Sequence, residues 1–429
     1  MIRGSLFTAL LVLAPSLATA QGLAGPFGGL FGRAPERIGK EYSALDLRST
    51  VGGQYDAAIL DDSSPAALVP ASGSTAGANA GLTFERRSDR LRLEANGSVA
   101  HHQFSRKPAV SATSYDAGAL LITEVATRLS LEASASYLRS PFYHLGLDAG
   151  VPDAAFVLPG GAFAARLLDN ETSAGTVGFT SPYSKRSTLN ASYSRSGTRF
   201  FDEPDNNYEM WGAQASWRHK LSRDVGAHVT FGREQVRQSG AAGRFVHETI
   251  DIGLDLTRGV SLARRTELTF YTQTSMVRET AGERHYRLNG GIALTRGFRR
   301  TWVATLAAHR DTDFLPGFLQ PVFSDGVNAS VSGLLAKRIE WSGAIGASRG
   351  QVGFDDPGKF LNYNGMTRLA AGVTRHLGVY AQYAYYRYDV PFGSTAVFLL
   401  PHQSRQSVSV GFSAYVPIFN KVRAPRDPG

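Results

Sequence analysis

Apolar and polar side chains alternate along most of the chain with a period of two. Leu91, Leu93 and Val99 occupy odd positions, and polar or small residues such as Arg92 and Glu94 lie between them. A period of two places successive side chains on opposite faces of a β-strand. The same pattern recurs over residues 129–137, 246–257, 267–271, 287–295 and 407–416. It predicts strands with one apolar and one polar face, and it does not fit an amphipathic helix.

Two kinds of connection alternate between these predicted strands. Short basic turns lie at residues 86–90, 127–129, 184–186, 219–223, 257–259, 295–300, 337–338 and 374–377. Longer segments rich in Gly, Pro, Asp and Ser lie at residues 60–75, 106–114, 141–169, 199–206, 238–244, 280–284, 314–323, 351–359 and 390–403. Short turns at one rim and long loops at the other are typical of bacterial transmembrane β-barrels.

This arrangement predicts an all-β fold, a closed antiparallel transmembrane β-barrel. Counting the hairpins gives about 18 strands between Tyr42 and Phe419, and 16 strands is the nearest alternative. An even number places both chain ends on the periplasmic side, and a barrel of this size encloses a water-filled lumen unless a loop fills it. A soluble propeller is the competing fold, but no blade motif of ~40 residues recurs.

The start of the chain indicates export. Arg3 precedes an apolar run at residues 6–13, and Ala18-Thr19-Ala20 is a small-x-small triplet of the kind that signal peptidase cleaves. We therefore expect a Gram-negative outer-membrane protein, cleaved near Ala20. The expected organisation is a signal peptide at 1–20, a flexible periplasmic segment at 21–41, a transmembrane barrel at 42–419 and a periplasmic tail at 420–429.

Composition narrows the class of membrane protein. Hydrophobic residues make up 43% of the chain and the mean hydropathy is −0.16, which excludes a helical membrane protein but not a barrel. The absence of cysteine excludes disulfides and thiolate chemistry. The net charge of +9 suggests contact with anionic lipopolysaccharide or polysaccharide, or a lumen that attracts anionic solutes. Nucleic acid is not an expected partner of an exported chain.

Three segments carry a resemblance to known features of outer-membrane proteins. The hairpins GLDLTRGVSLARR and GGIALTRGFRR, within residues 42–419, resemble outer-membrane β-barrel porins associated with exopolysaccharide secretion systems. This resemblance implies an outer-membrane location and a role in polymer export or surface assembly. The closing segment is similar to the C-terminal β-signal that the outer-membrane assembly machinery reads, through Ser409, Gly411, Ala414, Val416 and Phe419.

No constellation of residues predicts catalysis. The stretch from Phe270 to Ser275 is similar to a fragment of outer-membrane phospholipases, but the His and Ser motif that those enzymes need is absent. His101 and His102 are adjacent on a strand, so they point to opposite faces and cannot chelate one metal ion. We expect no enzyme, no metal site and no cofactor.

The charged side chains expected to face the lumen are the only cluster with functional potential. They are Arg92, Glu94, Glu132, Asp251, Asp255, Glu267 and Arg287. Charged groups around a watery lumen can set solute preference. They can equally pair with one another across strands and stabilise the wall. The sequence does not separate these two interpretations.

Three functions follow from these observations. The first is a porin-like passive channel, and the second is an accessory or structural component of exopolysaccharide export. A lipid hydrolase is a remote third. The transported solute, the oligomeric state and whether the loop at 141–169 folds into the lumen remain open.

Overall fold

The computed structural model describes most of the expected barrel. The described residues are 41–59, 73–104, 110–144, 164–222, 224–239, 244–259, 266–279, 283–298, 301–315, 318, 320–354, 358–389 and 402–423. The expected signal peptide and residues 21–40 lie outside this part of the chain.

Eighteen strands make up the fold. They are β1 (Glu41–Ile59), β2 (Gly73–Arg87), β3 (Leu91–Phe104), β4 (Val110–Ala126), β5 (Leu129–His144), β6 (Ala164–Ser181), β7 (Ser187–Phe200), β8 (Tyr208–Lys220), β9 (Val225–Gln238), β10 (Arg244–Gly259), β11 (Thr266–Glu279), β12 (Arg284–Phe298), β13 (Trp302–Asp313), β14 (Val322–Ala336), β15 (Ile339–Val352), β16 (Gly358–Gly372), β17 (Leu377–Asp389) and β18 (His402–Arg423). A short 3-10 helix, η1 (Pro204–Asn206), lies between β7 and β8.

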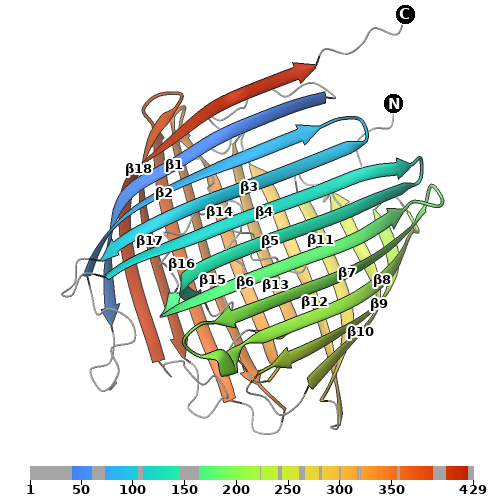
Figure 1. The fold of residues 1–429 in the computed structure, drawn as a ribbon. Coiled ribbons are helices and arrows are strands. Elements are labelled where there is room, and N and C mark those ends of the chain that lie inside the picture. The colour runs from blue at the N-terminus through green and yellow to red at the C-terminus, as the bar shows by residue number, and fades with distance from the viewer. Residues whose placement is uncertain are drawn as a thin grey trace, which may run out of the picture.

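The strands form one closed antiparallel barrel. Each strand pairs with its sequence neighbours, and β1 also pairs with β18, so the sheet has no free edge strand. Figure 1 shows this closure, with the blue β1 beside the red β18. The predicted fold class and the count of 18 strands are therefore confirmed.

The two rims of the barrel differ in their connections. The start of β1 and the end of β18 lie at the same rim (Figure 1), which also holds the turns at residues 88–90, 127–128 and 337–338. We call it the short-turn rim. The opposite, long-loop rim holds the connections at residues 60–72 and 145–163, among others.

Side chains alternate between an exposed apolar outer face and a buried or half-buried polar inner face. Ile252 on β10 and Phe412 on β18 are 72% and 67% exposed, whereas their neighbours Asp251 and Ser413 lie on the inner face. An apolar outer face and a polar inner face fit a wall between two different solvents, because only alternate side chains meet each one.

Several strand ends differ from the expectation. Residues 420–423, expected in a periplasmic tail, continue β18 and pair with the first residues of β1, from Glu41 to Ala44. The register of this pairing shifts by one residue between Leu45 and Asp46. Residues 110–114, 141–144 and 164–169, expected in long loops, are strand residues, because the hairpins extend beyond the alternating cores that the sequence pattern shows.

A close backbone approach marks the closing seam between β1, β17 and β18. Gly411 lies opposite both Gly52 on β1 and Tyr380 on β17. A Cβ atom on Gly411 would lie 2.6 Å from the Val51 carbonyl oxygen and 2.8 Å from the Tyr380 hydroxyl. Glycine at this position therefore lets the Tyr380 side chain lie over the seam.

In the described residues, no helix is long and apolar enough to cross a membrane.

Candidate functional site

Three of the seven expected lumen residues, Arg92, Glu94 and Glu132, lie together near the short-turn rim. Arg92 and Glu94 lie on the inner face of β3, and the Arg92 Nε atom donates a hydrogen bond of 2.6 Å to a Glu94 carboxylate oxygen. Arg92 lies level with Ile122 on β4, which in turn lies level with Glu132 on β5. These residues therefore form one charged group on the inner face.

Asp251, Asp255 and Glu267 lie on other strands and do not join this group. On β10, Asp251 contacts His228 of β9, with 2.8 Å between His228 Nε2 and a carboxylate oxygen. Glu267 is half-buried on the inner face of β11. Asp255 lies opposite Gly226, and its side chain is outside the described part of the chain.

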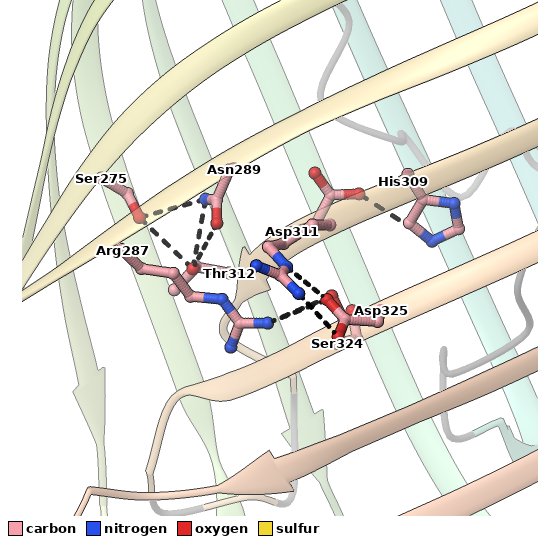
Figure 2. A network of polar contacts seen from close by, with 9 residues as sticks. Ser275, Arg287, Asn289, His309, Asp311, Thr312, Ser324 and Asp325 are labelled. Atoms are coloured by element: carbon pink, nitrogen blue, oxygen red, sulfur yellow. Dashed lines mark hydrogen bonds and ion pairs between the residues drawn. The ribbon is translucent and has the colours of Figure 1, made fainter.

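Arg287 belongs to an ion-pair cluster at the other end of the barrel. One Arg287 terminal nitrogen lies 3.3 Å from Asp325 Oδ1 (Figure 2). Arg310 donates two further hydrogen bonds, of 2.6 and 3.1 Å, to the same carboxylate. The Arg287 guanidinium also lies 5.0 Å from the centre of the Phe323 ring. A carboxylate with two guanidinium partners joins β12, β13 and β14 at this point.

A second, uncharged cluster lies beside the first. Asn289 Nδ2 donates hydrogen bonds to the hydroxyl oxygens of Ser275, at 3.0 Å, and Thr312, at 3.2 Å (Figure 2). Ser275 is fully buried, and its described hydrogen-bond partners are the side chains of Asn289 and Thr312. The fragment similar to phospholipases therefore does not present Ser275 to the lipid surface.

These clusters mark the place where β13 leaves the barrel wall. The pairing of β12 with β13 runs from Phe298 and Trp302 to Gly290 and Arg310 and ends there. Beyond that point Thr312 contacts Asn289 and Ser275, which belong to the inner faces of β12 and β11. The end of β13 therefore lies on the inner side of the wall.

The segment that follows reaches across the inside of three further strands. The Phe314 side chain packs against Tyr208, Val236 and Phe245, which lie on the inner faces of β8, β9 and β10. The Tyr208 hydroxyl donates a hydrogen bond of 3.1 Å to the Phe314 carbonyl oxygen. We call residues 311–322 the inward segment, of which 316, 317 and 319 are outside the described residues.

A second loop contributes to the same packing. Phe354, which follows β15, stacks on His285 with 3.7 Å between the ring centres, and its ring lies 5.4 Å from that of Phe323. The sequence pattern predicted a long loop here, although Phe314, Leu315 and Phe318 in it are apolar. Apolar residues in such a loop indicate burial. The loop at 145–163 lies outside the described residues.

The charges of the described strands divide between the two faces. The ion pair of Arg310 and Asp325 is left out of this comparison, because its two charges cancel. The inner-face carboxylates are Asp46, Asp56, Glu85, Glu94, Asp116, Glu124, Glu132, Glu234, Asp251, Glu267, Asp311, Asp313 and Glu340. The inner-face basic residues are Arg48, Arg87, Arg92, Arg218, Lys220, Arg287, Arg368 and Arg405. Carboxylates outnumber basic groups on the inner face, so the net positive charge of the chain is not located there.

The segment similar to a β-signal lies in β18. Ser409 and Gly411 are on the inner face, and Ala414 and Val416 are on the outer face. The Phe419 ring, also outside, lies 6.5 Å from the Phe84 ring of β2.

The chain is similar to solved structures of known proteins, and the similarity is one of fold. No protein-family model matches the chain, and no curated protein matches it. OpdL of Pseudomonas aeruginosa is similar, at 12% identity and a TM-score of 0.47, over 88% of this chain and 99% of that one. OccAB4 of Acinetobacter baumannii is similar at 12% identity and a TM-score of 0.46, over 89% of this chain and 100% of that one. The siderophore receptor PirA of P. aeruginosa is similar at 9% identity and a TM-score of 0.43, over 87% of this chain and 80% of that one. All three TM-scores are below 0.5, so the architecture is established by the strand pairing of this chain itself.

Proposed function

We propose that the protein is a passive channel for small polar solutes in a Gram-negative outer membrane. The observation that carries this proposal is the polar inner face of a closed barrel of 18 strands. Barrels of 16 to 18 strands are wide enough to hold a continuous column of water. The exposed apolar outer face fits the lipid phase on the other side of the wall.

Aromatic side chains on the outer face support the membrane location. Phe298, Trp302 and Trp341 form a row of rings near the short-turn rim, with centres 5.9 Å apart. Further around the barrel, Trp217 is 39% exposed beside Tyr183. Tryptophan and tyrosine are enriched where hydrocarbon meets headgroups, so this row fits the periplasmic interface.

The solute preference follows from the inner-face charges. The excess of carboxylates favours cations over anions, since charges that line a pore concentrate counter-ions. This inference replaces the anion-attracting lumen expected from the net charge. The inward segment reduces the open cross-section beside β8–β12, which favours small solutes.

The experiment that tests the channel is conductance in a planar lipid bilayer. Purified, refolded protein is added to one side in symmetric KCl, and stepwise current increases are expected as single barrels insert. Barrels that insert without producing steps would contradict the proposal. If deletion of the gene in the source bacterium then also changed surface polysaccharide, the exopolysaccharide hypothesis would replace it.

A variant of the inward segment provides a second test. Phe314→Ala removes the ring that packs on Tyr208, Val236 and Phe245, so the segment should move more freely in the lumen. We expect more frequent brief closures in the single-channel current than in the unsubstituted protein. An unchanged closure frequency would show that the segment does not affect the conducting path.

A further inference from the structure

The outer face of β7–β12 carries a concentration of arginine near the long-loop rim. Its members, which we call the outer arginine patch, are Arg195, Arg233, Arg237, Arg244, Arg278 and Arg284. The outward carboxylates on the described residues of these strands are Glu209 and Glu248. Six guanidinium groups therefore share this strand surface with two carboxylates, and Arg199, which also points outward on β7, lies opposite Glu171 of β6.

The carboxylates of Glu209 and Glu248 lie beside Arg195 and Arg233. Glu209 lies 3.9 Å from Arg195, and Glu248 lies 3.9 Å from Arg233, both near the limit of an ion pair. The Arg195 side chain is 69% exposed. Exposed pairs at such distances contribute little free energy.

Two pairs of arginines face each other directly across strands. Arg237 on β9 lies opposite Arg244 on β10, and Arg278 on β11 lies opposite Arg284 on β12. Side chains at directly opposed positions are close neighbours, and like charges there are destabilising. The Nε atom of Arg278 also has no hydrogen-bond acceptor among the described residues. An anion with several oxygens, placed between the guanidinium groups of Arg278 and Arg284, would remove the repulsion between them.

The patch lies directly beyond the apolar part of the outer face. Phe231, Ile250 and Leu288 form an exposed apolar row at 53%, 49% and 63% exposure. Arg233 follows Phe231 by two residues, and Arg237 follows it by six. At ~3.3 Å per residue along a strand tilted by ~40°, Arg237 is ~15 Å further from the membrane centre than that row. The patch therefore lies beyond the apolar row, on the side where lipid headgroups are found.

The neighbouring outer face lacks this excess of positive charge. On β5–β7, Arg139 and Arg199 lie level with Glu171, and Arg139 forms an ion pair of 2.9 Å with Asp169. Opposite charges therefore balance there, at the same rim and on the same face. The excess on β7–β12 is a local feature and not a general property of the rim.

We propose that the outer arginine patch binds the phosphate groups of an anionic glycolipid of the outer leaflet, of the lipopolysaccharide type. The proposal rests on the outer-membrane location proposed above. Arginine forms bidentate hydrogen bonds to phosphate, and a lipid with two phosphates can contact both opposed arginine pairs. Its acyl chains then lie against the apolar row below, so headgroup and chains contact one continuous surface.

The test compares two variants with equal losses of charge. The patch variant combines Arg237→Gln and Arg278→Gln, and the control combines Arg139→Gln and Arg199→Gln. Each protein is reconstituted in nanodiscs of phosphatidylcholine, and binding of added lipopolysaccharide is measured by native mass spectrometry. We expect at least a tenfold weaker binding for the patch variant and less than a twofold change for the control. Equal binding by the two variants would overturn the proposal.

Additional measurements identify the ligand and the folding state. Inorganic phosphate at millimolar concentration should not displace the lipid; displacement would mean that the patch is a site for free anions and would overturn the proposal. The shift in gel mobility on heating shows whether each variant is folded. A folded patch variant that conducts ions but binds lipid as the unsubstituted protein does would refute the lipid site while leaving the channel function intact.

Discussion

At the scale of single residues, glycine sets how closely the seam strands approach. Gly411 has its neighbouring backbone and the Tyr380 hydroxyl within the space that a Cβ atom would occupy. By contrast, a Cβ atom on Gly365 of β16 would meet only ordinary contacts at 3.6 and 3.8 Å. The two glycines lie in strands of the same barrel but have different steric environments.

Gly411→Ala should therefore destabilise the barrel, whereas Gly365→Ala should have a small effect. We expect a loss of about 1–3 kcal/mol for Gly411→Ala, because the added methyl group must displace backbone or Tyr380. Urea unfolding of both variants in detergent micelles, followed by tryptophan fluorescence, measures the difference. Equal midpoints would show that the seam accommodates the methyl group freely.

At the scale of elements, a buried ion pair joins the two ends of the chain. Arg405 on β18 donates a hydrogen bond of 2.8 Å to Asp56 on β1, and both side chains are buried. The Gln54 amide donates a second hydrogen bond, of 2.7 Å, to the same carboxylate. The pair therefore connects strands that are far apart in sequence but adjacent at the seam.

Removing only one partner of this pair should cost more than removing both. Arg405→Ala leaves the Asp56 carboxylate buried without its cation, with an expected loss of about 3–5 kcal/mol. Adding Asp56→Asn should restore part of that loss. A double-mutant cycle on the unfolding free energies gives the coupling, and a coupling near zero would show that water solvates Asp56 at this place.

At the scale of the whole molecule, basic groups are in excess on the outer face of the described strands, and carboxylates are in excess on the inner face. The outer arginine patch accounts for part of the first group, and carboxylates such as Glu132 and Glu267 belong to the second. The net charge of the whole chain does not show this difference between the two faces. In the proposed outer-membrane channel, lipid and solute therefore meet surfaces of opposite sign.

The division predicts the ion preference of the channel. In a KCl gradient the reversal potential should show a preference for potassium, and Glu132→Gln with Glu267→Gln should shift it towards zero, because two negative charges leave the lumen. Glu171→Gln, on the outer face, removes a charge without changing the lumen and should have no effect. A preference for chloride in the unsubstituted protein would contradict the proposed solute class.

The sequence predicted the features that depend on local patterns. Alternation at positions such as Leu91 and Arg92 follows from the two solvents, and the basic turns separate the hairpins, so the strand count was correct. The opposed pair Arg237 and Arg244 depends on cross-strand register, which one sequence does not fix. The path of the inward segment depends on contacts of Phe314 with strands distant in sequence. The apolar composition of that loop was a usable signal, but it does not specify which strands the loop covers.

The short pairing between β12 and β13 has a consequence for how the barrel opens locally. Residues 284–289 of β12 have no backbone partner on β13, whereas pairing of β1 with β18 continues along both strands. Hydrogen exchange followed by mass spectrometry should find faster deuterium uptake in 284–289 than in 290–298. Faster uptake there would mean that the wall opens transiently beside β12 and not between β1 and β18. Proteases or chemical probes should then react first at residues 284–289.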